Sequence, residues 1–119
     1  MGDIVLDVVN RASIIGRGKI QNIFGYGKIC GKATILVLDV QLIEGVIVDN
    51  AILRLSDGKL LKVVGLERWH EKIIEARAPE AVAVIVEGIG WRPREETLIR
   101  YKGQIVEIFK SMFPSVFHT

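Results

Sequence analysis

Residues 33–89 constrain the fold more than any other part of the sequence, because short stretches rich in β-branched residues follow one another there with turn residues between them. Stretches of this length and composition predict β-strands. Four or five such strands cannot all bury one face in a single flat layer, so we expect them to close into a small antiparallel barrel. The sequence therefore predicts an all-β protein.

Turn residues separate the expected strands. Asn50 tolerates the positive φ angle that a tight turn needs, and Asp57-Gly58 is a pair that hairpins prefer. Pro79 predicts a bend before an apolar strand at residues 81–87, and residues 97–101 are expected to form the last strand. We expect the interior to contain Ile35 or Val37 together with Leu53, Val64, Ile73, Val84 and Val86.

The 119 residues are expected to form one domain with three parts. Residues 1–32 should hold an N-terminal strand and a basic, glycine-rich segment, and residues 33–101 the barrel. Residues 102–119 should form a short helix and a tail. Four apolar residues there recur at helical spacing: Ile105, Ile108, Phe109 and Met112. We therefore expect a C-terminal helix from about Gln104 to Met112 that covers one end of the barrel.

Composition narrows the class of protein. The net charge is only +2, which by itself does not indicate nucleic-acid binding. Cys30 is the only cysteine, so an internal disulfide is excluded and a buried position in a reducing compartment is favoured. Asp3 and Asp7 stand where a signal peptide would be basic, and no apolar run reaches the roughly 18–20 residues that span a bilayer. We expect a cytoplasmic protein without a membrane partner.

Two groups of cations are the candidate RNA-binding residues. The first lies in a stretch without acids and includes two aromatic residues: Arg11, Arg17, Lys19, Lys28 and Lys32, with Phe24 and Tyr26. The second is the loop that contains Trp91, Arg92 and Arg94. Cations among aromatic rings can hold phosphates while the rings stack on unpaired bases. If both groups lie on one side of the barrel, Tyr26 and Trp91 would stack on exposed bases.

A structural interpretation of the same residues remains open. The first group would be two short strands with aromatic residues in the core and solvated lysines. In the second, Trp91 would cap a barrel end while the arginines pair with Glu95 and Glu96.

Catalytic motifs are not evident. Gly16 and Gly18 lack the third glycine and the helix of a dinucleotide-binding fingerprint. The glycines of residues 25–32 have the wrong spacing for a phosphate-binding loop, and Ala33 replaces the required Ser or Thr. His70 is alone at an expected hairpin tip, where solvation is the commoner explanation. We therefore expect no enzyme activity, no nucleotide hydrolysis, no cofactor and no metal.

A family resemblance covers roughly residues 34–100. It consists of a glycine turn at Gly45, a turn at Asn50, a strand that ends in residues 64–67, and a bend at Pro79 before the next strand. In this order the features resemble the second domain of translational GTPases such as elongation factor Tu. The chain departs from that family at Asn50, where Gly is usual, and in Ala-Pro-Glu at residues 78–80, where Ala-Gly-Asp is usual.

The resemblance implies a barrel of about six strands that ends with the strand at residues 97–99. The GTP-binding domain of the family has no counterpart in the sequence, so the chain most resembles a stand-alone barrel, as in small archaeal proteins. Its implied function is a binding module for structured RNA or the ribosome. The alternatives are a protein-interaction barrel or homo-oligomer without nucleic-acid contact and, with least support, a small-molecule-binding barrel or enzyme.

Overall fold

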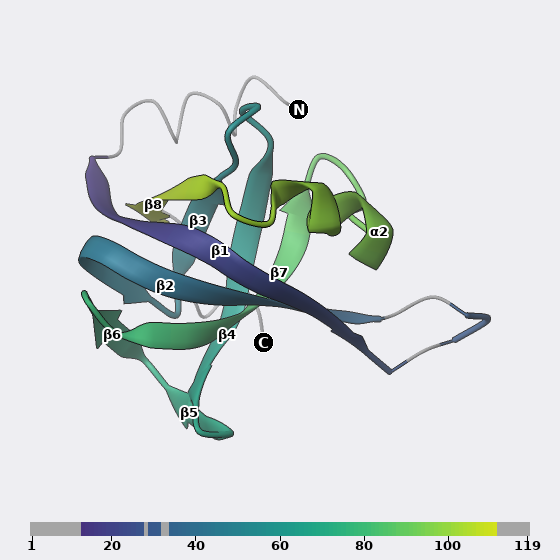
Figure 1. Ribbon diagram of the computed structural model, residues 1–119, viewed down its shortest axis with the longest axis horizontal. Coiled ribbons are helices and arrows are strands. Elements are labelled where there is room, and N and C mark those ends of the chain that lie inside the picture. The colour runs from purple at the N-terminus through teal and green to yellow at the C-terminus, as the bar shows by residue number, and fades with distance from the viewer. Residues whose placement is uncertain (1–12, 28, 32–33, 112–119) are drawn as a thin grey trace.

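The computed structural model describes residues 13–27, 29–31 and 34–111 (Figure 1). Eight strands and two short helical turns follow one another along the chain: β1 (Ile14–Tyr26), β2 (Ile35–Val48), β3 (Ala51–Arg54), β4 (Leu60–Arg68), β5 (Glu71–Ile73), β6 (Glu75–Arg77), β7 (Ala81–Ile89), α2 (Glu95–Leu98), the 3₁₀ turn η1 (Ile99–Tyr101) and β8 (Ile105–Lys110).

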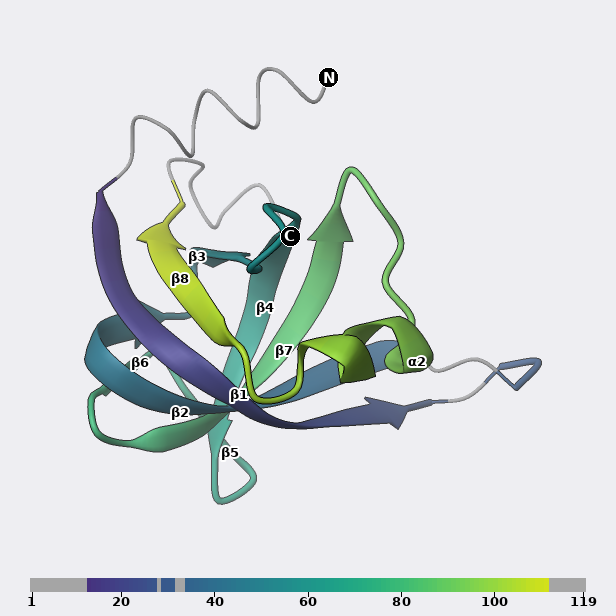
Figure 2. The same cartoon turned by 45° about the horizontal axis from the view of Figure 1, so that its top comes forward.

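Six of these strands form a closed antiparallel barrel. Each strand pairs with the next in the order β1-β8-β3-β4-β7-β2, and β2 pairs with β1 to close the ring. The short strands β5 and β6 lie outside the ring, where they pair with β4 and β2. Figure 2 shows the ring with α2 beside one end. The predicted all-β fold and six-stranded barrel are confirmed.

The barrel includes more of the chain than residues 33–101. Strand β1, from the predicted glycine-rich basic segment, and strand β8, from the predicted helix, complete the ring. Without them β2 and β3 would leave open strand edges, and closure satisfies the hydrogen-bonding groups of those edges. The N-terminal strand expected near residues 3–9 lies outside the described residues.

The predicted position of the helix was wrong. A short helix does occur in the C-terminal part of the chain, but it is α2 with η1, which replaces the strand expected at residues 97–101. In β8, Val106 and Ile108 face the interior, while Phe109 packs on the outside in a small cluster with Ile52 and Leu60. A strand that is apolar on both faces can imitate helical spacing over a few residues. Met112 lies outside the described residues.

The interior was predicted correctly in part. Leu53, Val84 and Val86 are fully buried, and Ile73 packs against the same cluster. Val64 was assigned to the wrong side, since a β-bulge between Val63 and Gly65 leaves it 43% exposed.

At the start of β2, neither of the two residues proposed for the interior, Ile35 and Val37, belongs to the interior cluster. Ile35 is 45% exposed, whereas Val37 is buried. Val37 is buried on the outer face of the sheet, because its neighbours Leu36 and Leu38 belong to the interior cluster and successive side chains alternate.

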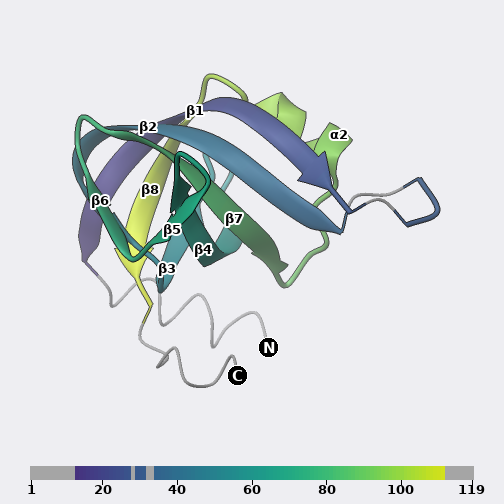
Figure 3. The ribbon, with the colours of Figure 1, turned by 90° about the horizontal axis from the view of Figure 1, so that it is seen from below.

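Gly45 lies between the stretch of β2 that pairs with β7, residues 36–41, and the stretch that pairs with β6, residues 46–48. Gly45 has a φ angle of 72°, and a Cβ atom there would collide with the Ile15 carbonyl of β1. Beyond the barrel, β1 and β2 continue as a projecting arm (Figure 3). Tyr26 ends β1 on this arm, in register with Ile35 of β2.

Candidate binding surfaces

The structure separates the residues that the sequence suggested for RNA binding. Arg11, Lys28 and Lys32 lie outside the described residues. Arg17 and Lys19 are on the outward face near the start of β1, while Tyr26 ends the same strand and is 55% exposed. At about 3.3 Å per residue, Arg17 and Tyr26 are roughly 30 Å apart along the strand. Trp91, Arg92 and Arg94 lie in the loop between β7 and α2.

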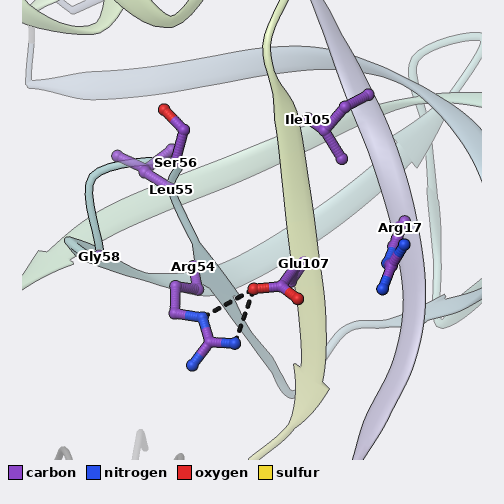
Figure 4. A pocket seen from close by; sticks show the side chains of 7 residues that line it. All are labelled: Arg17, Arg54, Leu55, Ser56, Gly58, Ile105 and Glu107. Atoms are coloured by element: carbon purple, nitrogen blue, oxygen red, sulfur yellow. Dashed lines mark hydrogen bonds and ion pairs between the residues drawn. The ribbon is translucent and has the colours of Figure 1, made fainter.

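Arg17 belongs to a ladder of alternating charges. In strand register, Glu44 of β2 pairs with Arg17, Arg17 with Glu107 of β8, and Glu107 with Arg54 of β3. Arg17 Nε is 3.3 Å from Glu44 Oε1, and Arg54 Nη2 is 2.7 Å from Glu107 Oε1. Arg17, Arg54 and Glu107 line a shallow pocket of about 380 Å³, which Figure 4 shows. Each cation of this charge ladder therefore has a carboxylate beside it.

Trp91 holds its loop against the end of the barrel. Its indole N–H donates a hydrogen bond of 2.7 Å to the Leu60 carbonyl, and its ring packs against the interior cluster. The Lys59 ammonium group lies 5.0 Å from the centroid of the same ring. Gly88 permits this arrangement, because a Cβ atom there would collide with the Trp91 carbonyl. This arrangement matches the structural interpretation, in which Trp91 caps a barrel end.

The end of the barrel around Trp91 is rich in cations. Five exposed basic residues lie at this end of the barrel, and we call them the basic end: Lys59, Arg92, Arg94, Arg100 and Lys102. Lys59 has a carboxylate neighbour, with its Nζ 3.8 Å from Asp57 Oδ2. Within the described part of the chain the other four form no ion pair, so the expected pairing of the arginines with Glu95 and Glu96 is absent there.

Sequence analysis missed three members of the basic end. Lys59 lies in a hairpin turn, Arg100 lies within η1, and Lys102 directly follows η1, where residues 97–101 were expected to form a strand. Their common position depends on contacts between distant segments. The Tyr101 hydroxyl donates a hydrogen bond of 2.5 Å to Asp57 Oδ2, which joins η1 to the β3–β4 turn. Burial, followed by this carboxylate, raises the pKa of Tyr101 to about 12.

A second surface is a groove on the outer face of the sheet. The floor and one wall are apolar: Phe24 and Tyr26 of β1, Val37 of β2, and Ala81 and Ala83 of β7. The opposite wall is the β4–β5 hairpin, with Trp69 and His70 at its tip. The volume is about 480 Å³, and Figure 3 shows this side of the molecule. We call it the aromatic groove.

Three exposed aromatic side chains border the aromatic groove. The rings of Phe24 and Tyr26 are stacked with their centroids 6.5 Å apart. Trp69 is 90% exposed, and the sequence analysis did not select it. A tryptophan in a two-residue hairpin turn, where Asn-Gly is usual, is the signal that could have identified it.

Cys30 and His70 are both exposed. Cys30 is exposed, so its predicted burial was wrong: it lies in the turn of the β1–β2 arm, away from the interior. His70 is exposed at the hairpin tip, as expected.

The described residues contain no group of three or more His, Cys, Asp or Glu residues placed to hold a metal ion. None of the helices in the described ranges is long and apolar enough to cross a membrane.

Comparisons with known proteins find similarity in structure. No family model and no curated protein matches the sequence. Translation elongation factor SelB of Methanococcus maripaludis, crystallised with a GTP analogue, matches 88% of this chain at a TM-score of 0.58 and 20% identity. GDP-bound aIF5B of Aeropyrum pernix matches 89% at a TM-score of 0.57 and 22% identity.

The matched proteins are much longer. This chain covers 22% of the SelB chain and 17% of the aIF5B chain. At these identities the similarity shows the fold alone. The chain therefore has the fold of a barrel-sized portion of translation factors, in agreement with the resemblance to their second domain.

Proposed function

We propose that this protein is a non-catalytic binding module of the translation apparatus, which contacts structured RNA or the ribosome through the basic end. One observation carries the proposal: Arg92, Arg94, Arg100 and Lys102 are exposed at the same end of the barrel without a carboxylate partner among the described residues. The shared fold with SelB and aIF5B supports the link to translation.

The chemistry of the basic end suits phosphate groups. Arginine presents a planar set of N–H donors that matches phosphate oxygens, and lysine adds a flexible point charge. Pro93 is buried between Arg92 and Arg94, so the backbone that carries both guanidinium groups is fixed on the barrel. Contacts of this kind position RNA without selecting its sequence. A role in translation would place the protein in the cytoplasm.

Salt-dependent binding tests the proposal. The full chain should retain transfer RNA or ribosomal RNA fragments on a filter at about 50 mM salt, with an affinity that falls steeply as salt is added. The triple variant Arg92→Gln, Arg94→Gln, Lys102→Gln should weaken binding to all sequences similarly. Its slope of log affinity against log salt should flatten by roughly one unit per lost phosphate contact.

A matched control removes the same charge elsewhere. The triple variant Lys72→Gln, Arg77→Gln, Lys110→Gln changes β5, β6 and the end of β8, away from the basic end. It should bind RNA almost as well as the unmodified chain. Equal losses in both triple variants would show that only net charge matters, and no retention at low salt would favour the protein-interaction alternative.

A further inference from the structure

The aromatic groove contains two carboxylates that form no ion pair with any residue that the structure describes. Asp39 of β2 and Glu67 of β4 both stand in register with Ala83 of β7, one on each side. Their Cα atoms are therefore two strand spacings apart, about 9–10 Å. Both side chains are half-buried and line the groove, and the methyl group of Ala83 leaves the space between them open.

Two cations lie nearby. Arg68 itself lines the groove, where it is engaged by Glu80 in an ion pair. Lys72 is the cross-strand neighbour of Glu67, but it lines a different pocket with Lys62 and Glu87. Across the described ranges, neither Asp39 nor Glu67 forms an ion pair. The groove thus offers two negative charges in a partly desolvated, apolar setting.

The hairpin tip presents its aromatic residue in an unfavourable backbone conformation. Trp69 and His70 have φ angles of 52° and 65°, which fit the turn between two paired strands but are uncommon for bulky residues. The turn nevertheless exposes Trp69 beside the groove instead of burying it. The groove therefore has aromatic residues on two opposite sides, Phe24 and Tyr26 on one and Trp69 on the other.

We propose that the aromatic groove binds an arginine side chain presented by an extended segment of a partner protein. A guanidinium group above Ala83 would donate hydrogen bonds to Asp39 and Glu67 while its plane packs against the indole ring of Trp69. The groove volume of about 480 Å³ accommodates such a side chain with its flanking residues. This surface is separate from the basic end, so the proposal does not depend on RNA binding.

The charge of the groove distinguishes a protein ligand from RNA. Tyr26 and Trp69 could also stack on bases, but the phosphates of a bound strand would then approach Asp39 and Glu67, whose negative charges repel them. A cationic peptide compensates the same two charges. The observations therefore favour the peptide, and RNA becomes an alternative outcome of the test.

Nuclear magnetic resonance of the ¹⁵N-labelled full chain provides the experiment. The probe is the acetylated, amidated peptide Gly-Leu-Arg-Leu-Gly, with a matched peptide that carries neutral citrulline in place of arginine. The arginine peptide should shift the amide resonances of Glu67 and Ala83 and the indole N–H of Trp69. The citrulline peptide should bind at least tenfold more weakly.

Three variants separate the contributions of the two carboxylates and of the Trp69 ring to peptide binding. Asp39→Asn with Glu67→Gln should reduce affinity for the arginine peptide at least tenfold. Trp69→Asn with His70→Gly gives the turn its preferred residues, so it should retain the hairpin resonances and lose at least half of the binding signal. Glu44→Gln removes a carboxylate from the charge ladder and should leave binding unchanged.

Equal binding of the arginine and citrulline peptides, or shifts confined to residues outside the groove, would overturn the proposal. So would a groove that instead binds single-stranded oligoadenylate, with affinity that rises when Asp39 and Glu67 are neutralised.

Discussion

The charge ladder and the aromatic groove both lie on the outer surface of the barrel. Acids and cations are paired in the ladder, whereas the described residues form no ion pair with Asp39 and Glu67 in the groove. In the ladder, Glu44, Arg17, Glu107 and Arg54 alternate across four adjacent strands. In the groove, the register from β2 to β4 places Ala83 between two acids where a cation could have stood. Cross-strand pairs of opposite charge stabilise a sheet. Of the two acids in the groove, Glu67 faces Lys72 of β5 in register, but the described residues show no ion pair for either acid.

The difference indicates which surface serves the fold and which is available to a partner. Arg54 also lies over the Phe109 ring at 4.8 Å, so the ladder covers apolar surface as well as balancing charge. The groove leaves Tyr26 and Trp69 exposed beside its uncompensated acids. Variants that lower stability should therefore concentrate in the interior and the ladder, whereas variants in the groove should change binding of the arginine peptide.

The largest effect is expected in the interior that both surfaces share. Val84 lies on β7 directly after Ala83 and is fully buried, so Val84→Ala should lower the free energy of unfolding by about 1–3 kcal/mol. Val64→Ala is the matched control, because Val64 is 43% exposed at the β-bulge, and it should cost well under 1 kcal/mol. Urea denaturation measures both, and similar losses would contradict the assigned burial.

A gain of stability is expected at the wall of the groove. Trp69→Asn with His70→Gly replaces two bulky residues at positive φ by the pair that this turn type prefers. Relief of the left-handed conformation should raise the free energy of unfolding by about 1–2 kcal/mol, since little buried area is lost with a side chain that is 90% exposed. Thermal unfolding should show a rise in Tm of several degrees. A lower Tm would mean that Trp69 packs against the protein more than its exposure indicates.

Much of the barrel was predictable from local patterns. Turn residues located the β3–β4 hairpin at Asp57-Gly58 and the bend at Pro79, and the apolar alternation of β7 identified Val84 and Val86 as interior. These features depend on neighbours within a few residues. The register shift that exposes Val64 depends on pairing with β7, which no local pattern contains.

The candidate surfaces were less predictable because they join distant segments. Lys59 and Trp91 come together only after the barrel closes. Arg17 was selected as a cation in an acid-free stretch, but its carboxylate neighbours, Glu44 and Glu107, arrive from β2 and β8. Sequence proximity therefore identified a basic segment, whereas the structure shows that part of its charge is compensated across strands.

The smallest effects on stability are expected when one carboxylate of each surface is neutralised. Glu107→Gln removes the charge that Arg54 contacts at 2.7 Å and leaves two guanidinium groups facing each other across β8. Because this pair is only partly shielded from solvent, the loss should be about 1 kcal/mol and should shrink at high salt. Glu67→Gln makes the same chemical change in the groove.

Glu67 forms no ion pair within the described residues, so Glu67→Gln should alter the free energy of unfolding by no more than about 0.5 kcal/mol in either direction. Urea denaturation at low salt and in about 0.5 M salt should therefore show a salt-sensitive difference between the two variants. If Glu67→Gln were as costly as Glu107→Gln at low salt and recovered in the same way, Glu67 would have a cationic partner within the protein. The groove could then not offer both of its carboxylates to an arginine from outside.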